Sequence, residues 1–267
     1  MKTNGQFLST NRQTRMLQIE SSEQSVIGYA KDYPAGLVAD VHMHNRAQLI
    51  YAVTGVMHVD TETTCYVIPP KAALLMPAGM MHSIYMDGHV AMRSLFLRST
   101  QALGRCNKCK VISVTPLMHE LILAACSESM AQGENQRGHH INMLALDEID
   151  RASELPLELP LPSDPRLRKV VDAIRQNPST PNTLYEWAEI ANTSERTLAR
   201  LFRNQTGQSF RQWRQHARLV AAMSALAIGK NPTMASAIAG YDSHSAFGVA
   251  FRKFFGVTPG QARRMAN

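Results

Sequence analysis

A short proline-rich segment divides this sequence into two unlike parts. The segment from Leu155 to Pro165 contains four prolines, counting Pro165 itself. Proline lacks an amide hydrogen and fixes its own φ, so the segment cannot form a continuous helix and favours an extended, stiff connection. We therefore predict a domain linker at 154–165. It separates an N-terminal part rich in short apolar runs, typical of strands, from a C-terminal part with helical periodicity almost throughout.

Composition indicates a folded chain with one basic end. Of the 267 residues, 45% are hydrophobic and 18% are charged, which supports real cores and argues against disorder. The formal net charge is +7; residues 164–267 hold 15 Lys+Arg against 6 Asp+Glu, hence +9, and the rest of the chain holds −2. A basic end favours a polyanionic partner, most often nucleic acid.

The sequence contains no apolar run near the roughly 20 residues that span a bilayer, and its polar first 20 residues do not resemble a secretory signal. We therefore expect a cytoplasmic protein without a membrane partner. In that compartment Cys65, Cys106, Cys109 and Cys126 are reduced thiols. Cys106 and Cys109 form a lone Cys-x-x-Cys pair, for which an ordinary loop, a redox role and a metal role all stay open.

Residues 26–98 predict an antiparallel barrel or sandwich, because short apolar runs alternate with turn residues. The predicted turns include Gly36, Gly55, the Pro77–Gly79 segment and Asp87-Gly88. Two amphipathic helices are expected at 115–130 and 138–153. Apolar helical faces outside a barrel need a partner, so we assign 1–113 to the barrel and 114–153 to a segment that pairs two subunits.

Three histidines of the predicted barrel are candidates for one site. His42 and His44 alternate along a strand, so both side chains point to one face. A second strand pair can bring His82 beside them. Three imidazoles can hold a divalent metal such as zinc or nickel, with Gln48 as a weaker oxygen ligand.

The spacing of these residues, Gly36-x5-His42-x-His44-x3-Gln48 followed by Pro77-x-Gly79-x2-His82, resembles the two cupin motifs. The resemblance implies a cupin-like β-barrel, a double-stranded β-helix. The usual metal-binding pattern has a carboxylate where Gln48 stands, and losing it weakens a site for a hard metal. Three interpretations stay open: an effector pocket without metal, a metal centre for sensing or catalysis, and hydrogen-bonded histidines in a filled barrel.

The C-terminal part predicts a helix-turn-helix unit at about 184–205. A short helix ends at the turn Asn192-Thr193, and Ser194 is a good N-cap for the next helix. Leu198 and Phe202 fall on the inner face of that second helix. Its outer face carries the row Arg196, Arg200 and Arg203. A helix held in this way enters the major groove of DNA, where arginine matches the two acceptors of guanine.

The pattern recurs at about 232–255, after a long helix that ends at Gly229. Ser243 caps the second candidate recognition helix, whose inner stripe is Phe247, Phe251 and Phe254. Its outer face holds His244, Ser245, Gly248, Val249 and Arg252, with Lys253 beside them to hold phosphates. Two such helices joined by one long helix are expected to contact successive major-groove segments about one turn of DNA apart.

These residues resemble the AraC/XylS family of bacterial regulators. The match runs through 194–202 (SERTLARLF), 206–207 (TG), 210–214 (FRQWR), 218–219 (RL), 240–243 (GYDS), 245–247 (SAF) and 251–260 (FRKFFGVTPG). The resemblance implies transcription control. By the family's pattern, base contacts fall to Arg196, Ala199 and Arg200 in the first unit and to His244, Ser245 and Val249 in the second, with Thr197 on the same DNA-facing surface.

The pairing of cupin-like motifs with this C-terminal part looks like the NimR-like branch of the family. This resemblance implies an autoregulating repressor of a neighbouring exporter gene. The expected fold is two-domain α+β, with an all-α DNA-binding domain at 166–267. We predict a DNA-binding regulator, not an enzyme. Its expected partners are double-stranded operator DNA, a small-molecule effector, a second copy of itself, and RNA polymerase if it activates. The alternatives are a metal-dependent cupin enzyme or a small-molecule binding protein with a helical appendage.

Overall fold

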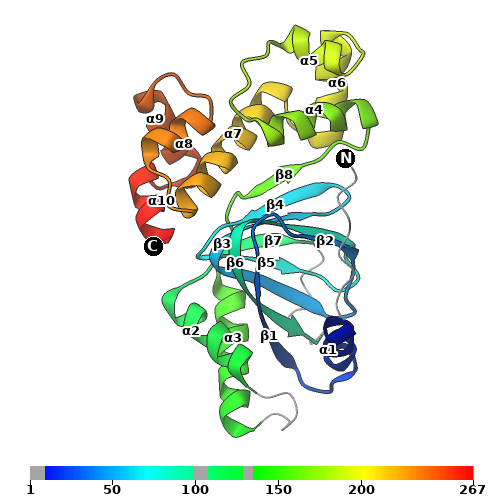
Figure 1. Cartoon of the computed structure of the whole chain (residues 1–267), viewed down its shortest axis with the longest axis vertical. Coiled ribbons are helices and arrows are strands. Elements are labelled where there is room, and N and C mark those ends of the chain that lie inside the picture. Colours follow the sequence, from blue (N-terminus) through cyan, green and yellow to red (C-terminus); the bar gives the residue numbers. More distant parts are fainter. Residues whose placement is uncertain (1–9, 99–107, 129–134, 267) are drawn as a thin grey trace. The chain divides into compact units, whose positions relative to one another are not determined.

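The computed structural model describes residues 10–98, 108–128 and 135–266 and divides the chain into two compact units (Figure 1). The sheet unit comprises 1–59 and 70–155, and the helical unit comprises 60–69 and 156–267. This confirms a two-domain α+β chain. Within the described ranges, no helix has both the length and the apolar character needed to cross a membrane.

The sheet unit is an antiparallel sheet flanked by three helices. Strand β6 pairs with β1 and β2, and β5 pairs with β3 and β7. With β6 next to β3, the order is β1-β6-β3-β5-β7, which is cupin-like but does not close a ring among the described residues. The elements are α1 (Thr10–Ser21), β1 (Val26–Tyr33), β2 (Val38–His42), β3 (Ala47–Asp60), β5 (Ala72–Met76), β6 (His82–Leu97), β7 (Lys110–Ser113), α2 (Pro116–Ser127) and α3 (Gln136–Arg151).

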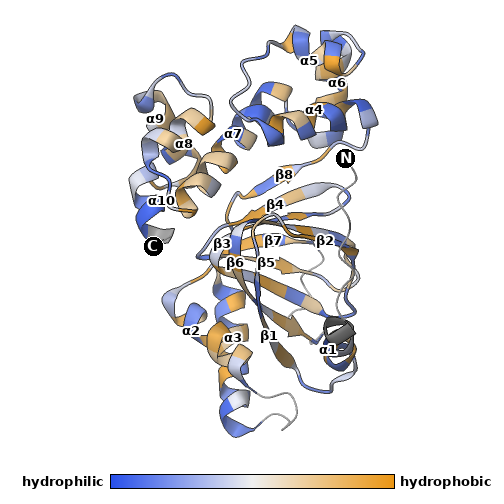
Figure 2. Cartoon of the chain, in the orientation of Figure 1, coloured by the Kyte–Doolittle hydropathy of each residue, from blue (hydrophilic) through white to orange (hydrophobic). Residues whose placement is uncertain are grey.

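Helices α2 and α3 cover one face of the sheet. Thr115 and Asn135 cap their N-termini through side-chain oxygens. Met118, Ile122 and Ile149 enter the same buried cluster as the strand residues. Figure 2 shows apolar stretches along both helices and the strands. The helices also leave apolar side chains in solvent, namely Leu117, Met143 and Leu144, each at least half exposed.

Two predicted turns of the sheet unit are wrong. Strand β3 runs without a break through Gly55, and β6 runs through Asp87-Gly88. Gly55 has φ +79°, and a Cβ there would lie 2.3 Å from the carbonyl oxygen of His89. The glycine therefore serves a close approach of two strands and not a chain reversal. Helix α1 was not expected, because its sequence is mostly polar, although its Ile19 is fully buried.

The helical unit contains α4 (Pro165–Gln176), α5 (Leu184–Ile190), α6 (Glu195–Thr206), α7 (Phe210–Ala227), α8 (Pro232–Ile238), α9 (His244–Phe255) and α10 (Pro259–Ala266). The long helix α7 contacts α4, α6, α8, α9 and α10, so it is the centre of this unit. Phe247 and Phe251 of α9 pack with Leu219 and Leu226 of α7 in one buried cluster.

The proline-rich segment belongs to the helical unit. It is extended, as its prolines predict, but it forms strand β8 (Glu158–Pro160), which pairs with β4 (Thr64–Ile68). Leu157, Leu159 and Leu161 are buried. The indole Nε1 of Trp213 donates to the Pro160 carbonyl at 2.7 Å, and His216 Nε2 lies 3.2 Å from the Pro156 carbonyl oxygen. Helix α7 thus holds the segment in place.

We expect His216 to make the helical unit sensitive to acid. Burial lowers the pKa of this ring, against a smaller raising contribution from the Pro156 carbonyl. The ring also packs on Phe254, with centroids 4.4 Å apart. The unfolded chain, with its pKa near 6.5, therefore takes up the proton first, so stability is full above about pH 6.5 and falls as pH drops below it.

Urea unfolding of the wild type and of His216→Gln at about pH 7.5 and about pH 5 measures this effect. The amide of glutamine is a neutral donor and does not titrate. The variant is expected to lose less stability on acidification than the wild type. Equal losses in both proteins would contradict the assignment.

Candidate DNA interface and histidine cluster

Helix α6 presents the predicted arginine row to solvent. Ser194 accepts from the Thr197 amide at the N-terminus of the helix, and Gly207 ends it in the left-handed conformation. Leu198 and Phe202 are fully buried, which fixes the rotation of the helix about its axis. Arg196, Arg200 and Arg203 are consequently exposed, together with Ala199. Thr197 is half-buried, and its hydroxyl accepts from the Ser194 hydroxyl.

Helix α9 repeats this construction. Ser243 accepts from the Ala246 amide, and Gly256 ends the helix in the left-handed conformation. Phe247 and Phe251 are buried, whereas Phe254 is half-buried. The outward residues His244, Ser245, Val249, Arg252 and Lys253 are exposed, and Gly248 is half-buried. Val249 is 70% exposed, which is unusual for a branched apolar side chain at the middle of a helix.

The cations of both helices lack intramolecular partners among the described residues. In the helical unit, the ion pairs join Arg166 to Asp164 and Arg175 to Asp60, at 2.7 and 2.9 Å. Neither pair involves α6 or α9. The two helices therefore carry five exposed basic side chains without an acidic partner among the described residues. These are Arg196, Arg200, Arg203, Arg252 and Lys253.

Two arginines of α7 hydrogen-bond to the loop that precedes the first helix-turn-helix unit. Arg214 donates to the carbonyls of Asn182 and Thr180, and Arg218 donates to the carbonyls of Pro178 and Thr180. These bonds fix the loop between α4 and α5. The sequence indicated both arginines only through the resemblance to the family. Nothing in the neighbouring sequence shows that these helical arginines hydrogen-bond to a distant loop.

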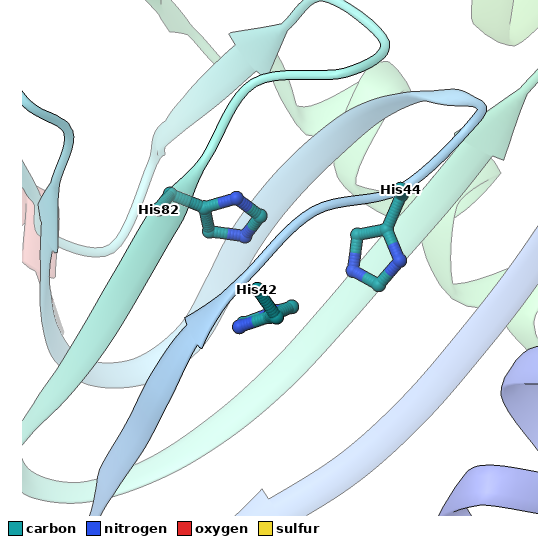
Figure 3. Close-up of side chains that lie close together, drawn as sticks. All are labelled: His42, His44 and His82. Atoms are coloured by element: carbon teal, nitrogen blue, oxygen red, sulfur yellow. The ribbon is translucent and has the colours of Figure 1, made fainter.

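The three predicted histidines of the sheet unit lie together. Figure 3 shows His42 at the end of β2, His44 just beyond it and His82 at the start of β6. Ring centroids are 4.3 Å apart for His42 and His82, and 5.1 Å for His42 and His44. Backbone pairing explains the convergence, since His42 is opposite His82 in the register and the Gly79 amide donates to the His44 carbonyl.

Each of these rings has an oxygen beside its Nδ1 atom. His42 Nδ1 lies 2.6 Å from the Asp40 carbonyl oxygen, and His82 Nδ1 lies 2.9 Å from that of Met80. His44 Nδ1 lies 3.4 Å from a carboxylate oxygen of Glu20. Burial lowers the pKa of His82 to about 4, with the Met80 carbonyl opposing and His42 adding to the shift. His82 is therefore neutral at physiological pH.

Gln48 lies on the cavity that His42 and His44 line, as predicted, and donates from Nε2 to the Ser94 hydroxyl at 3.3 Å. Glu20 was missed. It comes from α1, and its carboxylate also accepts from the Asn45 amide. No signal in a polar N-terminal stretch marks such a residue, because its role depends on a contact across 25 positions of the chain.

The cysteines show no reactive thiol site among the described residues. Cys65, Cys109 and Cys126 form no disulfide, and Cys65 and Cys109 are buried. Burial raises the pKa of Cys65, and it raises that of Cys126 to about 11, so both stay protonated at neutral pH. Cys106 lies outside the described residues, so the Cys-x-x-Cys pair itself stays a prediction.

Family models match both units of the chain. A model described as an AraC-like ligand binding domain matches residues 23–145, and a helix-turn-helix domain model matches residues 187–265. Helices α6 and α9 both fall within the second match.

One relative of known function covers most of the chain. The HTH-type transcriptional regulator NimR of Escherichia coli is 32% identical over 225 residues, covering 84% of this chain and 82% of NimR. The regulator RipA of Corynebacterium glutamicum is 37% identical over 100 residues, which are 38% of this chain and 30% of RipA. The structure of ToxT from Vibrio cholerae aligns over 91% of this chain at 12% identity with a TM-score of 0.39. The chain therefore belongs to the AraC family of DNA-binding transcriptional regulators, in which an AraC-like ligand-binding domain accompanies the helix-turn-helix domain.

Proposed function

We propose that α6 and α9 are the recognition helices and that they contact successive major-groove segments of one operator. The observation that carries this proposal is the pair of exposed, unneutralised basic rows on two helices built in the same way. Arg196 and Arg200 provide forked donors for guanine, and Val249 provides an apolar contact for a thymine methyl group. Arg203, Arg252 and Lys253 lie nearer the helix C-termini and hold phosphates.

Replacing Arg196 with alanine is expected to weaken binding to the specific operator by roughly 1–3 kcal/mol and to relax preference at one base pair. Replacing Lys253 with alanine is instead expected to weaken binding to all sequences and to lower the salt slope by about one unit. Gel-shift titrations at several salt concentrations, on operator and on random DNA, measure both effects.

The matched control is Lys169→Ala, because Lys169 is an exposed cation on α4, outside both rows. It is expected to change affinity little. Equal losses of Arg196→Ala on operator and random DNA would contradict base recognition by α6. The DNA upstream of the protein's own gene is the first operator candidate, and a footprint there tests the autoregulation and exporter control that the NimR-like resemblance implies.

The protein acts as a homodimer in the cytoplasm, with a ligand of the sheet unit modulating DNA binding and no catalysis of its own. The exposed Leu117, Met143 and Leu144 on α2 and α3 support the dimer, because apolar side chains gathered on one helix pair gain stability by burial against a second copy. If the protein activates transcription, RNA polymerase is a further partner. In sedimentation experiments we expect the wild type to behave as a dimer and Leu144→Glu as a monomer.

A further inference from the structure

The histidine cluster has the geometry of a metal site. One ligand nitrogen from each of His42, His44 and His82 can be chosen such that all lie within 4.8 Å of one another. A tetrahedral ion with bonds of about 2.1 Å places its nitrogens about 3.4 Å apart. The three side chains lie around one space, and rotation of their rings would have to close that difference (Figure 3).

The hydrogen bonds around the rings select the metal-binding tautomer. A carbonyl or carboxylate oxygen can only accept, so the Nδ1 atoms of His42 and His82 carry the proton toward Asp40 and Met80. The neutral ring then has its lone pair on Nε2. Glu20 does the same for His44. An oxygen partner on the far nitrogen is the usual support of a histidine that ligates a metal.

Two buried polar atoms at this place have no partner. His82 Nε2 and Gln48 Oε1 are both inaccessible to solvent and make no hydrogen bond, in residues only 2% and 4% exposed. If the Gln48 amide is turned round, one of its polar atoms still lacks a partner. A buried polar group without a partner destabilises the folded protein. An ion bound to His82 Nε2 and a water between that ion and Gln48 would satisfy both.

The size of the cavity favours an ion over an organic molecule. The cavity lined by His42, His44 and Gln48 has about 20 Å³ of room for water-sized occupants. A single water needs about 10–15 Å³ by this measure, so the space fits an ion with a water and no drug-sized effector. Met16, Met86 and Met92 also line this cavity and make its wall largely apolar.

We propose that His42, His44 and His82 bind one divalent transition metal ion through Nε2, and that this ion is the ligand that modulates the regulator. The second half of the statement rests on the proposed DNA-binding function. Three neutral imidazoles without a carboxylate ligand suit zinc, nickel or cobalt and not magnesium or calcium. Glu20 is a positioning residue, which orients His44 from α1.

The site is tested with the full chain, stripped of metal and titrated with Co²⁺, whose visible absorption reports its coordination. One equivalent of bound Co²⁺, displaced by Zn²⁺, is expected. His82→Gln and His42→Gln are expected to weaken binding by more than the roughly 10–100-fold that a lost supporting contact causes, and Glu20→Gln to fall within that range. His89→Gln, an exposed histidine on the same strand β6, is the matched control and keeps wild-type binding.

Thermal melting of each variant without metal shows whether it folds, and His42→Gln, at a half-buried position, keeps the test usable if His82→Gln does not. Absence of a Co²⁺ spectrum in the wild type, or wild-type binding by folded His42→Gln, overturns the metal site. The second measurement is the gel shift on upstream DNA with and without Zn²⁺. A zinc-dependent affinity that His42→Gln abolishes supports the regulatory role; an unchanged affinity overturns that role and leaves DNA binding itself standing.

Discussion

Replacing Trp213 with alanine is expected to destabilise the helical unit by about 3–5 kcal/mol. The side chain is fully buried, and its ring packs edge-on against Phe202 of α6 with ring centroids 5.5 Å apart. Its indole N–H donates to the Pro160 carbonyl of β8. Its removal leaves a cavity next to α6 and leaves the Pro160 carbonyl without its donor. Urea unfolding followed by circular dichroism measures the loss.

Two further variants separate the contributions. Trp213→Phe keeps most of the packing and removes the hydrogen bond, so it is expected to lie between the wild type and Trp213→Ala. Tyr185→Ala removes an aromatic ring that is 60% exposed on α5 and is expected to change stability by at most about 0.5 kcal/mol. A Trp213→Ala protein no less stable than Tyr185→Ala would contradict the position of Trp213 in the core.

The second large effect is expected for Gly240→Ala, in the turn between α8 and α9. Gly240 has φ +66°, where an L side chain costs roughly 1–2 kcal/mol. A Cβ at this position would also lie 2.9 Å from Ser179 Cα and 3.1 Å from an Arg218 nitrogen. Ser179 lies in the loop between α4 and α5, and Arg218 of α7 holds that loop through the Pro178 and Thr180 carbonyls. Both helix-turn-helix units are therefore expected to shift.

Gly207→Ala is the matched control for this change. Gly207 has φ +72° and ends α6, but a Cβ there would meet nothing within 4 Å. It therefore reports the backbone cost alone. We expect Gly240→Ala to lower both the unfolding midpoint and the operator affinity clearly more than Gly207→Ala. Equal effects of the two substitutions would show that the contact with Ser179 is unimportant.

The sequence allowed the helical unit to be predicted well, because its signals are local. Caps at Ser194 and Ser243 and buried stripes at helical spacing are set by neighbours along the chain. The histidine cluster was also predictable, since alternation fixes a face and the motif spacing brings His82 to His42. What these residues bind stays a prediction.

Contacts between distant segments explain what was missed. The turn assigned to Gly55 was wrong, because only the position of His89 on β6 shows why a glycine is needed there. Strand β8 had a visible signal, with leucines at every second position from Leu155 to Leu161, but its partner strand lies about 90 positions earlier. The prolines led to the prediction of a linker, although the alternating leucines also indicated a strand.

The strand pair β4–β8 has an evolutionary consequence. Because residues 60–69 come from the N-terminal half yet belong to the helical unit, this unit is discontinuous in sequence. A gene fusion joined at position 166 would transfer α6 and α9 without Leu157, Leu159 and Leu161 and without strand β4, which pairs with β8. Exchange of the helical unit between relatives of this protein is therefore expected to preserve its stability only when both segments are transferred together.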